Sequence, residues 1–416
     1  MFISITNIIV QNGGDAAIML GMIKSIKKAF GDNCVVRAFT ESESFCKRHY
    51  PDIESGETFG RLAVSSPYNA YRIIGRRFQM LKAFWYMLCG YLYSKGFPLC
   101  MLPLRQKAKS ALKSYGESDI VISCGGTYLV EAYGIYAQYV DYKVVKFLHK
   151  PFFFYTQSIG HFSYPKNRRW LFEMFEYSKA IFLRDCQSFK NVCNISQSFK
   201  NKCSIFADAA FCLLDHSVVP GQKRLNPLVA ISVRKWIHAR NPNAICEYRR
   251  AMAASIIWLI EHNYEVQILS TCQGNLNYTD DNDEADAILE QIPVAQRNKI
   301  LRCYDVKTPL QIIDILRRSE FLIATRLHMA ILGCISGIPV LPIAYEFKTE
   351  ELFKNEFGYP TILNTDSITA ELLIRTLNDF VVNMEAYSSK IHNKIGQLAQ
   401  NSCMAAERLC AITRAF

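Results

Sequence analysis

The sequence predicts an α/β protein with two doubly wound, Rossmann-like domains, each built on a parallel sheet. The chain has 416 residues, which is too long for one ordinary domain and suits two. Short apolar segments alternate with amphipathic helical segments, a pattern typical of parallel sheets. The alternation stops at the polar, turn-rich segment Pro220–Pro227 and then starts again. We therefore expect ligands in the cleft between the domains, at the carboxyl ends of the strands.

The first domain is predicted to span residues 1–218 and to open with a strand at Phe2–Val10. The turn Gly13-Gly14-Asp15 leads from this strand into a helix at Ala16–Phe30. Further apolar segments of strand length follow at Cys34–Phe39, Asp119–Ser123, Pro151–Thr156 and Ala180–Leu183.

The second domain is predicted over residues 226–380, with a helix at Tyr248–His262. Its strands are expected at Leu228–Val233, Tyr264–Leu269, Lys299–Arg302, Phe321–Ala324 and Pro339–Ile343. The last segment, 381–416, contains a long helix at about Met384–Thr413 that is expected to pack back on the first domain. Two doubly wound domains in series predict a GT-B-like architecture.

Residues 58–116 form a basic and aromatic insert in the first domain. They contain no Asp or Glu, and their ten cations are Arg61, Arg72, Arg76, Arg77, Lys82, Lys95, Arg105, Lys107, Lys109 and Lys113. Aromatic residues between such cations are typical of segments that lie on a membrane surface. The alternative is a pair of helices docked on the domain with their basic ends in water. Nucleic-acid binding is disfavoured because no RNA-binding motif accompanies the charge.

Composition narrows the compartment and the class of partner. The formal net charge of +11 favours anionic partners. Fifteen cysteines without a CxxC pair argue against a zinc ribbon and suit a reducing cytosol. Since the chain opens on a strand-like segment without a basic leader, and no apolar run is long enough to span a bilayer, we expect a cytoplasmic protein. The basic insert would make it peripheral on the inner face of the membrane.

The segment Phe321–Gly337 carries the strongest candidate site. An apolar strand ends at Thr325, Arg326 and His328 follow, and a helix begins. The start of that helix offers free N–H groups to an anion, and arginine adds a charged fork for carboxylate or phosphate. Histidine can exchange a proton near neutral pH. The alternative is a surface arginine and a helix-capping histidine.

Two further segments end at the same predicted edge of the second sheet. Arg234 stands directly after the strand Leu228–Val233, and Tyr345 and Lys348 follow the strand Pro339–Ile343. Two arginines at one edge would suit a small anion with two or three charges. Solvated loops at these strand ends are the alternative.

Two glycine turns mark the first domain. Gly13-Gly14-Asp15 would let a ligand approach the backbone closely, although Asp15 can equally cap the following helix. Gly125-Gly126-Thr127 ends a strand and is followed by Glu131 and Tyr133. Glu131 would serve as a base for a sugar hydroxyl or accept a hydrogen bond from it. Neither turn is a GxGxxG motif, so no dinucleotide site is indicated.

Nine segments in this order resemble the polysaccharide pyruvyl transferase family, most closely its colanic-acid-type members. They are Asn12–Ile18, Asp119–Gly134, Gln157–Gly160, Leu183–Ser188, Asp208–Phe211, Ile231–Trp236, Leu269–Gln273, Thr325–Ala330 and Ala344–Lys348. Each is weak alone, but their order and spacing together are specific.

The resemblance implies a GT-B-like enzyme that uses phosphoenolpyruvate as donor and forms a cyclic pyruvate ketal on two hydroxyls of a sugar. The sugar would belong to a capsule or exopolysaccharide precursor, lipid-linked or soluble, and no metal or nucleotide cofactor would be needed. The second domain would hold the donor and the first domain the acceptor.

The family's motifs also assign roles to particular residues. The donor-binding arginine falls on Arg234 and the Arg-x-His pair on Arg326 and His328, with Leu327 between them; Tyr345 and Lys348 complete the donor site. His328 would be the acid, Glu131 or Asp15 would act on the sugar hydroxyls, and Gly125, Gly126, Thr127 and Tyr133 would contact the acceptor. Two departures stand out: relatives more often have Asp at position 131, and usually proline at position 161, where this chain has His161.

Two other functions use many of the same features. A GT-B glycosyltransferase with a nucleotide-sugar donor would need a similar cationic cleft, and release of a nucleotide would distinguish it. A non-catalytic, membrane-associated scaffold of a polysaccharide assembly would keep the 58–116 segment but tolerate the loss of His328.

Overall fold

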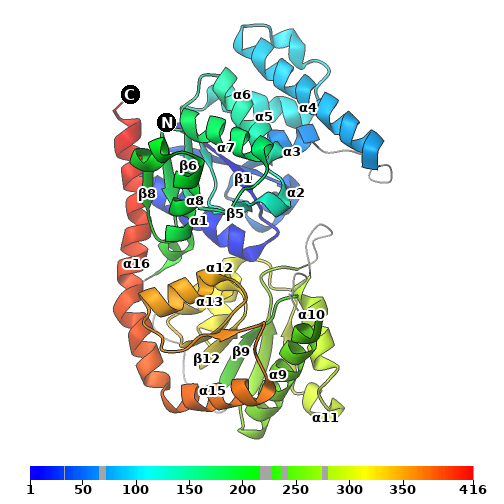
Figure 1. Cartoon of the computed structure of the whole chain (residues 1–416), viewed down its shortest axis with the longest axis vertical. Coiled ribbons are helices and arrows are strands. Elements are labelled where there is room, and N and C mark those ends of the chain that lie inside the picture. Colours follow the sequence, from blue (N-terminus) through cyan, green and yellow to red (C-terminus); the bar gives the residue numbers. More distant parts are fainter. Residues whose placement is uncertain (32, 65–71, 216–226, 236–241, 274–279, 416) are drawn as a thin grey trace. The chain divides into compact units, whose positions relative to one another are not determined.

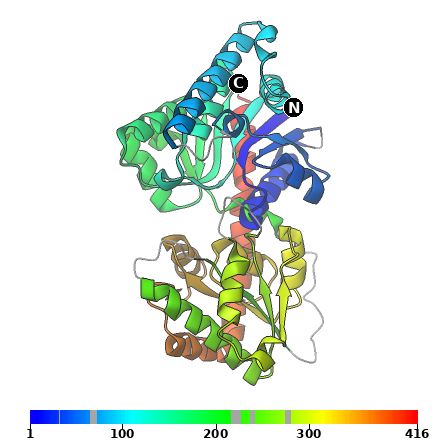
Figure 2. The same ribbon diagram turned by 90° about the vertical axis from the view of Figure 1, so that its right-hand side faces the viewer.

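The structure is a computed structural model that describes residues 1–31, 33–64, 72–215, 227–235, 242–273 and 280–415. The chain forms two compact units (Figures 1 and 2). Unit 1 comprises Met1–Val10, Ile18–Cys212 and Asn401–Phe416, and unit 2 comprises Gln11–Ala17 and Leu213–Gln400. The expected linker at Pro220–Pro227 lies outside the described residues, apart from Pro227.

Unit 1 is built on a parallel sheet of eight strands in the order β3-β2-β1-β4-β6-β7-β8, with β5 pairing to β6. The strands are β1 (Phe2–Ile8), β2 (Val35–Thr40), β3 (Glu54–Glu57), β4 (Ile120–Ser123), β5 (Gly126–Leu129), β6 (Phe152–Ile159), β7 (Ala180–Leu183) and β8 (Cys203–Ile205). Every residue of β4 and β6 is buried, which explains their continuous apolar character.

Helices cover the sheet of unit 1, as Figure 1 shows. They are α1 (Gly13–Phe30), α2 (Glu43–His49), α3 (Phe59–Val64), α4 (Arg72–Ser94), α5 (Gln106–Glu117), α6 (Tyr136–Phe147), α7 (Pro165–Tyr177) and α8 (Cys186–Ile195), with short helices η1 (Pro98–Met101), η2 (Glu131–Tyr133), η3 (Gln197–Lys202) and η4 (Ala209–Leu213).

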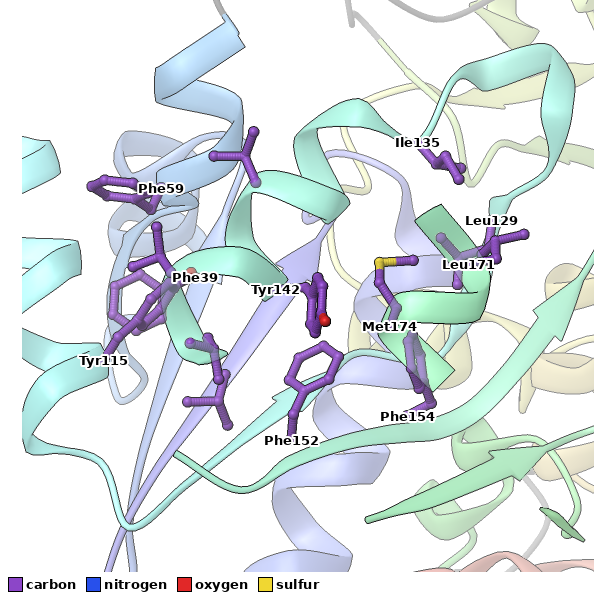
Figure 3. Close-up of a cluster of buried hydrophobic side chains, with 14 of the residues drawn as sticks. Phe39, Phe59, Tyr115, Leu129, Ile135, Tyr142, Phe152, Phe154, Leu171 and Met174 are labelled. Atoms are coloured by element: carbon purple, nitrogen blue, oxygen red, sulfur yellow. The ribbon is translucent and has the colours of Figure 1, made fainter. Parts of the chain in front are cut away.

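A hydrophobic cluster rich in aromatic residues lies in the core of unit 1 (Figure 3). Phe39 and Tyr115 meet edge-to-face with ring centroids 4.9 Å apart, and Phe152 and Phe154 do so at 5.2 Å. This geometry adds roughly 0.5–1.5 kcal/mol per pair to the burial of the rings. The cluster therefore holds the helices and strands of unit 1 in one fixed arrangement.

Unit 2 has a parallel sheet of six strands in the order β11-β10-β9-β12-β13-β14. The strands are β9 (Leu228–Ser232), β10 (Glu265–Leu269), β11 (Ile300–Cys303), β12 (Phe321–Ala324), β13 (Val340–Ala344) and β14 (Leu363–Asn364). The helices are α9 (Pro242–Glu261), α10 (Asp281–Leu289), α11 (Val294–Arg297), α12 (Pro309–Leu316), α13 (Leu327–Ile335), α14 (Phe347–Glu350), η5 (Glu351–Glu356), α15 (Ala370–Val382) and α16 (Met384–Thr413).

The apolar strands predicted from sequence are all present, and four more were not predicted. The additional strands are β3, β5, β8 and β14, which have two to four residues each. Such short strands carry too few residues for alternation or an apolar run to be recognisable.

Among the described α-helices, α1 and α16 contribute residues to both units. The beginning of α1 belongs to unit 2, because Gly13 N–H donates to the Thr271 carbonyl (2.6 Å) and Asn12 forms a bridge with Cys272. The sequence pattern instead predicts this turn within the first domain. The end of α16 belongs to unit 1, where the Asn401 side chain accepts a hydrogen bond from Ala207 N–H (2.6 Å).

One buried carboxyl group joins three parts of unit 1. Asp141, on α6, is fully buried and can accept hydrogen bonds from Gly60 N–H (2.9 Å), the Tyr115 hydroxyl (3.1 Å) and the Thr6 hydroxyl (3.3 Å). Burial raises the pKa of Asp141 from 3.8 to about 7, although these hydrogen bonds act in the opposite direction. The folded state therefore favours the protonated carboxyl group.

This pKa predicts a pH dependence of stability. A carboxyl group whose pKa is raised on folding contributes most below about pH 4, and this contribution is lost as the pH rises to about 7. Relative to Asp141→Asn, the wild type should lose at most about 1.4 kcal/mol per pH unit in this window. Hydrogen exchange of β4 and β6 amides at several pH values would measure it. A difference between the two proteins that does not change with pH would contradict the prediction.

Candidate functional site

Three neighbouring strands of unit 2 end at the candidate site. In the sheet, β12 lies between β9 and β13, with Ala324 in register with Ser232 and Pro342. Because parallel strands end at one edge of a sheet, Arg234, Arg326 and Tyr345 emerge there together. The structure thus brings together three residues that lie in separate segments of the sequence.

Arg326 is held by a buried carboxylate. Its Nη2 donates to Asp281 Oδ1 (2.7 Å) and its Nε donates to Asp281 Oδ2, a two-point pair. Asp281, the first residue of α10, is fully buried, and the Arg326 side chain is 13% exposed. Burial raises the pKa of Asp281, and the charge of Arg326 opposes this effect. Arg326 is therefore a fixed cation with two of its nitrogens committed to Asp281.

Arg234 is positioned by two tyrosines. The centre of its guanidinium lies 3.6 Å from the centroid of the Tyr345 ring, a cation–π contact. Its backbone N–H donates to the Tyr248 hydroxyl (3.4 Å), which in turn lies 2.8 Å from the Thr325 hydroxyl. The hydroxyl of Tyr248 thus connects the ends of β9 and β12, and the ring of Tyr345 supports the Arg234 side chain.

His328 lies against the glycine turn Gly13-Gly14, which is near the start of the chain. It is the second residue of α13 and is half-buried. A side-chain Cβ at Gly14 would lie only 2.6 Å from His328 Nδ1 and 2.7 Å from its Cγ. Only glycine allows this approach without displacing the imidazole. The next residue, Asp15, is thereby in the same unit as His328, in the first turn of α1.

Two further residues that the sequence predicts for the anion site, Leu327 and Lys348, are close in sequence to Arg326 and Tyr345. Leu327 is the first residue of α13 and is half-buried. The Lys348 side chain is only 12% exposed, and its Nζ lies 3.7 Å from the Glu346 carboxylate. This ion pair reduces the charge that Lys348 can offer to an anion.

The first-domain motifs join around Arg184 in unit 1. Its Nη1 pairs with the Asp208 carboxylate, its Nε donates to Ser158 Oγ (2.8 Å), and its Nη2 donates to Thr127 Oγ1 (2.6 Å). The Arg184 side chain is 5% exposed. Four of the segments singled out in the sequence therefore meet in one hydrogen-bond network, which sequence analysis had not identified.

Gly125 and Gly126 are buried beneath this network. A Cβ at Gly125 would lie 2.8 Å from the Thr156 hydroxyl, and Gly126 has φ +137°, so both positions require glycine. The Gly126 carbonyl accepts a hydrogen bond from Gln157 Nε2 (2.8 Å). Of the predicted acceptor residues, Tyr133 is the most accessible, at 63%.

Glu131 holds the loop before α7. Its carboxylate accepts hydrogen bonds from Ser163 N–H (2.9 Å), Ser163 Oγ (2.5 Å), Tyr164 N–H (2.9 Å) and Asn167 Nδ2 (3.2 Å). Partial desolvation raises the pKa of Glu131, but the hydrogen bonds outweigh it and lower the pKa to about 2. Such a carboxylate is a weak base, and its four contacts hold the loop at Ser163 and Tyr164 and the side chain of Asn167 in the first turn of α7.

In the part of the chain that the structure describes, no group of three or more His, Cys, Asp and Glu side chains is placed to bind a metal ion.

Comparisons of sequence identify relatives. The family model described as polysaccharide pyruvyl transferase matches residues 12–346. The chain is 26% identical over 404 residues to a protein of Erwinia amylovora described as amylovoran biosynthesis protein AmsJ, covering 93% of each chain.

Comparisons of structure identify the same fold class. UDP-GlcNAc 2-epimerase from Neisseria meningitidis bound to UDP-GlcNAc matches with a TM-score of 0.60 and 11% identity, over 98% of this chain and 99% of that one. Anabaena Alr3699/HepE in complex with UDP-glucose matches with a TM-score of 0.58 and 10% identity, over 100% and 99%. These likenesses confirm the α/β, GT-B-like fold with Rossmann-like domains.

The buried pair predicts a large effect of one conservative substitution. Asp281→Asn would leave the Arg326 guanidinium buried without its counter-charge, which should cost roughly 3–5 kcal/mol of stability. Thermal unfolding and hydrogen exchange of α10 and α13 would measure the loss. Asp283→Asn is the matched control, because its carboxylate is 63% exposed and pairs with Lys235 Nζ at 3.1 Å; it should cost less than about 1 kcal/mol. Equal losses of stability in the two variants would show that the buried pair contributes no more than the exposed one.

Proposed function

Because the chain belongs to the polysaccharide pyruvyl transferase family, we propose that it moves a pyruvyl group from phosphoenolpyruvate to a sugar of a surface-polysaccharide precursor. The product would be a cyclic pyruvate ketal, with release of phosphate. The observation that carries the proposal is the gathering of Arg234, Arg326 and His328 at one edge of the unit 2 sheet. The relative named for amylovoran biosynthesis supports a role in exopolysaccharide synthesis.

The two arginines suit the two anionic groups of the donor. Phosphoenolpyruvate carries a carboxylate and a phosphate on a small carbon frame, and guanidinium groups bind both through paired hydrogen bonds. Asp281 fixes the Arg326 plane through Nε and Nη2, so the donor would engage Nη1. The ring of Tyr345 restrains the Arg234 guanidinium through a cation–π contact. Lys348 and Leu327 would complete the donor pocket. Restraint of both cations before binding lowers the entropy lost on binding.

His328 would start the reaction by protonating the methylene carbon of the donor, which makes C2 electrophilic. One sugar hydroxyl then adds to C2, the C–O bond to phosphate breaks, and the second hydroxyl closes the ketal. Of the two hydroxyl protons, one restores His328 and the other leaves with phosphate, so atoms and charge balance. This chemistry requires neither a metal ion nor a nucleotide.

Asp15 is the better candidate for the base that takes a hydroxyl proton. It follows Gly14, whose backbone contacts the His328 ring, whereas the carboxylate of Glu131 is occupied by four hydrogen bonds at the start of α7. In unit 1, Tyr133 would stack on the acceptor sugar, while Thr127, Gly125 and Gly126 would shape the backbone beneath it.

The cellular setting follows from the substrates. Phosphoenolpyruvate is a cytoplasmic metabolite, so we place the reaction in the cytoplasm. A lipid-linked acceptor would be displayed at the inner face of the membrane, where a peripheral enzyme can reach it.

Incubation of the purified protein with phosphoenolpyruvate and candidate lipid-linked or soluble glycans tests the proposal directly. The glycan should gain the mass of pyruvate less water, and phosphate should be released in equal amount. In heavy water, deuterium should appear in the ketal methyl group. Release of a nucleotide from a nucleotide sugar, with phosphoenolpyruvate ignored, would instead establish a glycosyltransferase.

The same assay separates binding from proton transfer. His328→Gln should lower turnover by at least about a hundredfold, within the usual range for a general acid, with little change in donor affinity. Arg234→Ala should mainly weaken donor binding, by roughly 2–5 kcal/mol. Near-normal turnover of His328→Gln on a confirmed acceptor would exclude His328 as the acid, and His161 and Lys348 would be tested next.

The contact between Gly14 and His328 gives a prediction with a built-in control. Gly14→Ala places a Cβ 2.6 Å from His328 Nδ1, whereas Gly13→Ala places one 3.3 Å from the Thr271 carbonyl oxygen. The first variant must displace the imidazole and should lose at least about tenfold in turnover, because general acids depend on position. The second needs a shift of only a few tenths of an ångström and should lose much less. Melting temperatures of both variants control for folding, and equal activities would show that the position of His328 is unimportant.

A further inference from the structure

An exposed apolar surface lies on α4 and the turn that follows it. Of 21 large hydrophobic residues exposed among those described, nine fall between positions 78 and 102. We call them the α4 apolar face; they are Phe78, Met80, Leu81, Phe84, Trp85, Tyr91, Phe97, Leu99 and Leu102. Leu99 is 75% exposed and Leu81 69%. A soluble monomer rarely exposes so many large apolar side chains together.

Six of the nine residues of the α4 apolar face lie on the outer side of α4, a helix that is well packed on its inner side. Ala83, Tyr86 and Cys89 are buried in the core of unit 1, and α4 packs against α3 and α6. Phe78, Leu81 and Trp85 recur at spacings of three and four residues, so they lie along one stripe. Figures 1 and 2 show α4 on the outside of unit 1. The inner face of α4 is therefore fixed in the core of unit 1, and its outer apolar face is exposed.

The segment that carries this face supplies cations and no carboxylates. The segment 58–116 contains no Asp or Glu. Lys82 and Lys95 lie over the rings of Tyr86 and Tyr91, at 5.5 and 5.7 Å from the centroids. Arg77, Lys95, Arg105, Lys109 and Lys113 have described positions in the same segment, from α4 to α5. An apolar stripe flanked by cations is complementary to a surface of acyl chains beneath anionic headgroups.

We propose that the α4 apolar face docks on an anionic lipid bilayer, with α4 lying in the plane of the headgroups. Within the described residues, no helix has both the length and the apolar character needed to cross a bilayer. A second copy of the chain fits poorly, because two such faces would bring their cations together with no carboxylate of the segment between them. The docking would place the proposed pyruvyl transfer beside a lipid-linked acceptor but does not depend on that transfer.

Vesicle sedimentation tests the proposal. The purified full-length protein should bind vesicles of phosphatidylglycerol and phosphatidylcholine at least about tenfold more strongly than pure phosphatidylcholine. Salt at about 1 M, where the screening length is ~3 Å, should release much of it. Leu81→Ser/Phe84→Ser/Trp85→Ser should bind at least about tenfold more weakly. Lys95→Gln/Lys109→Gln should lose roughly fivefold per cation.

A matched variant controls for the loss of exposed apolar surface in general. Val294→Ser/Leu301→Ser/Leu310→Ser removes side chains that are 65%, 51% and 52% exposed in unit 2; it should bind as the wild type does. Quenching of Trp85 by brominated lipid, in a protein whose three other tryptophans are replaced by phenylalanine, would place α4 in the headgroup layer.

Three results would overturn the proposal. One is equal binding of the wild type to neutral and anionic vesicles, and another is unchanged binding of the α4 triple variant. The third is a wild-type dimer in sedimentation velocity that the triple variant abolishes, which would assign the face to a second copy. Turnover of the triple variant on a soluble acceptor should stay normal, so failure of docking and failure of the proposed transfer give different results.

Discussion

The candidate site depends on the buried ion pair between Arg326 and Asp281. Asp281 opens α10 and Arg326 follows β12, so the pair fixes two elements that are distant in sequence. A buried pair adds little net stability compared with apolar packing, but removal of either partner leaves a charge without compensation. Its main effect is therefore geometric: it sets the plane of one guanidinium beside Arg234 and ahead of His328. The other residues of the site are arranged around the Arg326 guanidinium, whose orientation is fixed by its two hydrogen bonds to Asp281.

Close backbone approach is the second constraint. Gly14 allows the His328 ring to lie against the first turn of α1, where a Cβ would overlap it. Together with the hydrogen bond from Gly13 N–H to the Thr271 carbonyl and the bridge between Asn12 and Cys272, this contact explains why residues 11–17 belong to unit 2 although the chain on both sides of them belongs to unit 1. A short exchange of seven residues thus brings Asp15, from the start of the chain, into the unit that carries both arginines.

The sequence predicts the features that depend on local pattern and misses those that depend on distant pairing. The strands around Arg234 and Arg326 are continuous apolar runs, and the parallel-sheet rule then places both arginines at one edge. Asp281 carries no such signal: it lies 45 residues from its partner, in an acidic stretch that resembles a solvated helix start. The partners of Glu131 have no local sequence signal for a related reason, because Ser163, Tyr164 and Asn167 come from the loop before α7 and its first turn, more than 30 residues away.

The two units use the same pair of residue types differently. In each, an arginine follows a strand and meets a buried aspartate: Arg184 with Asp208 in unit 1, and Arg326 with Asp281 in unit 2. Arg184 also donates to Ser158 and Thr127, so its nitrogens bind the surrounding loops and the pair serves the framework. Arg326 directs both bonds from Nε and Nη2 to one carboxylate. The same pair of residue types thus supports the framework of unit 1 through bonds to several loops, whereas in unit 2 it fixes the plane of one guanidinium against a single carboxylate.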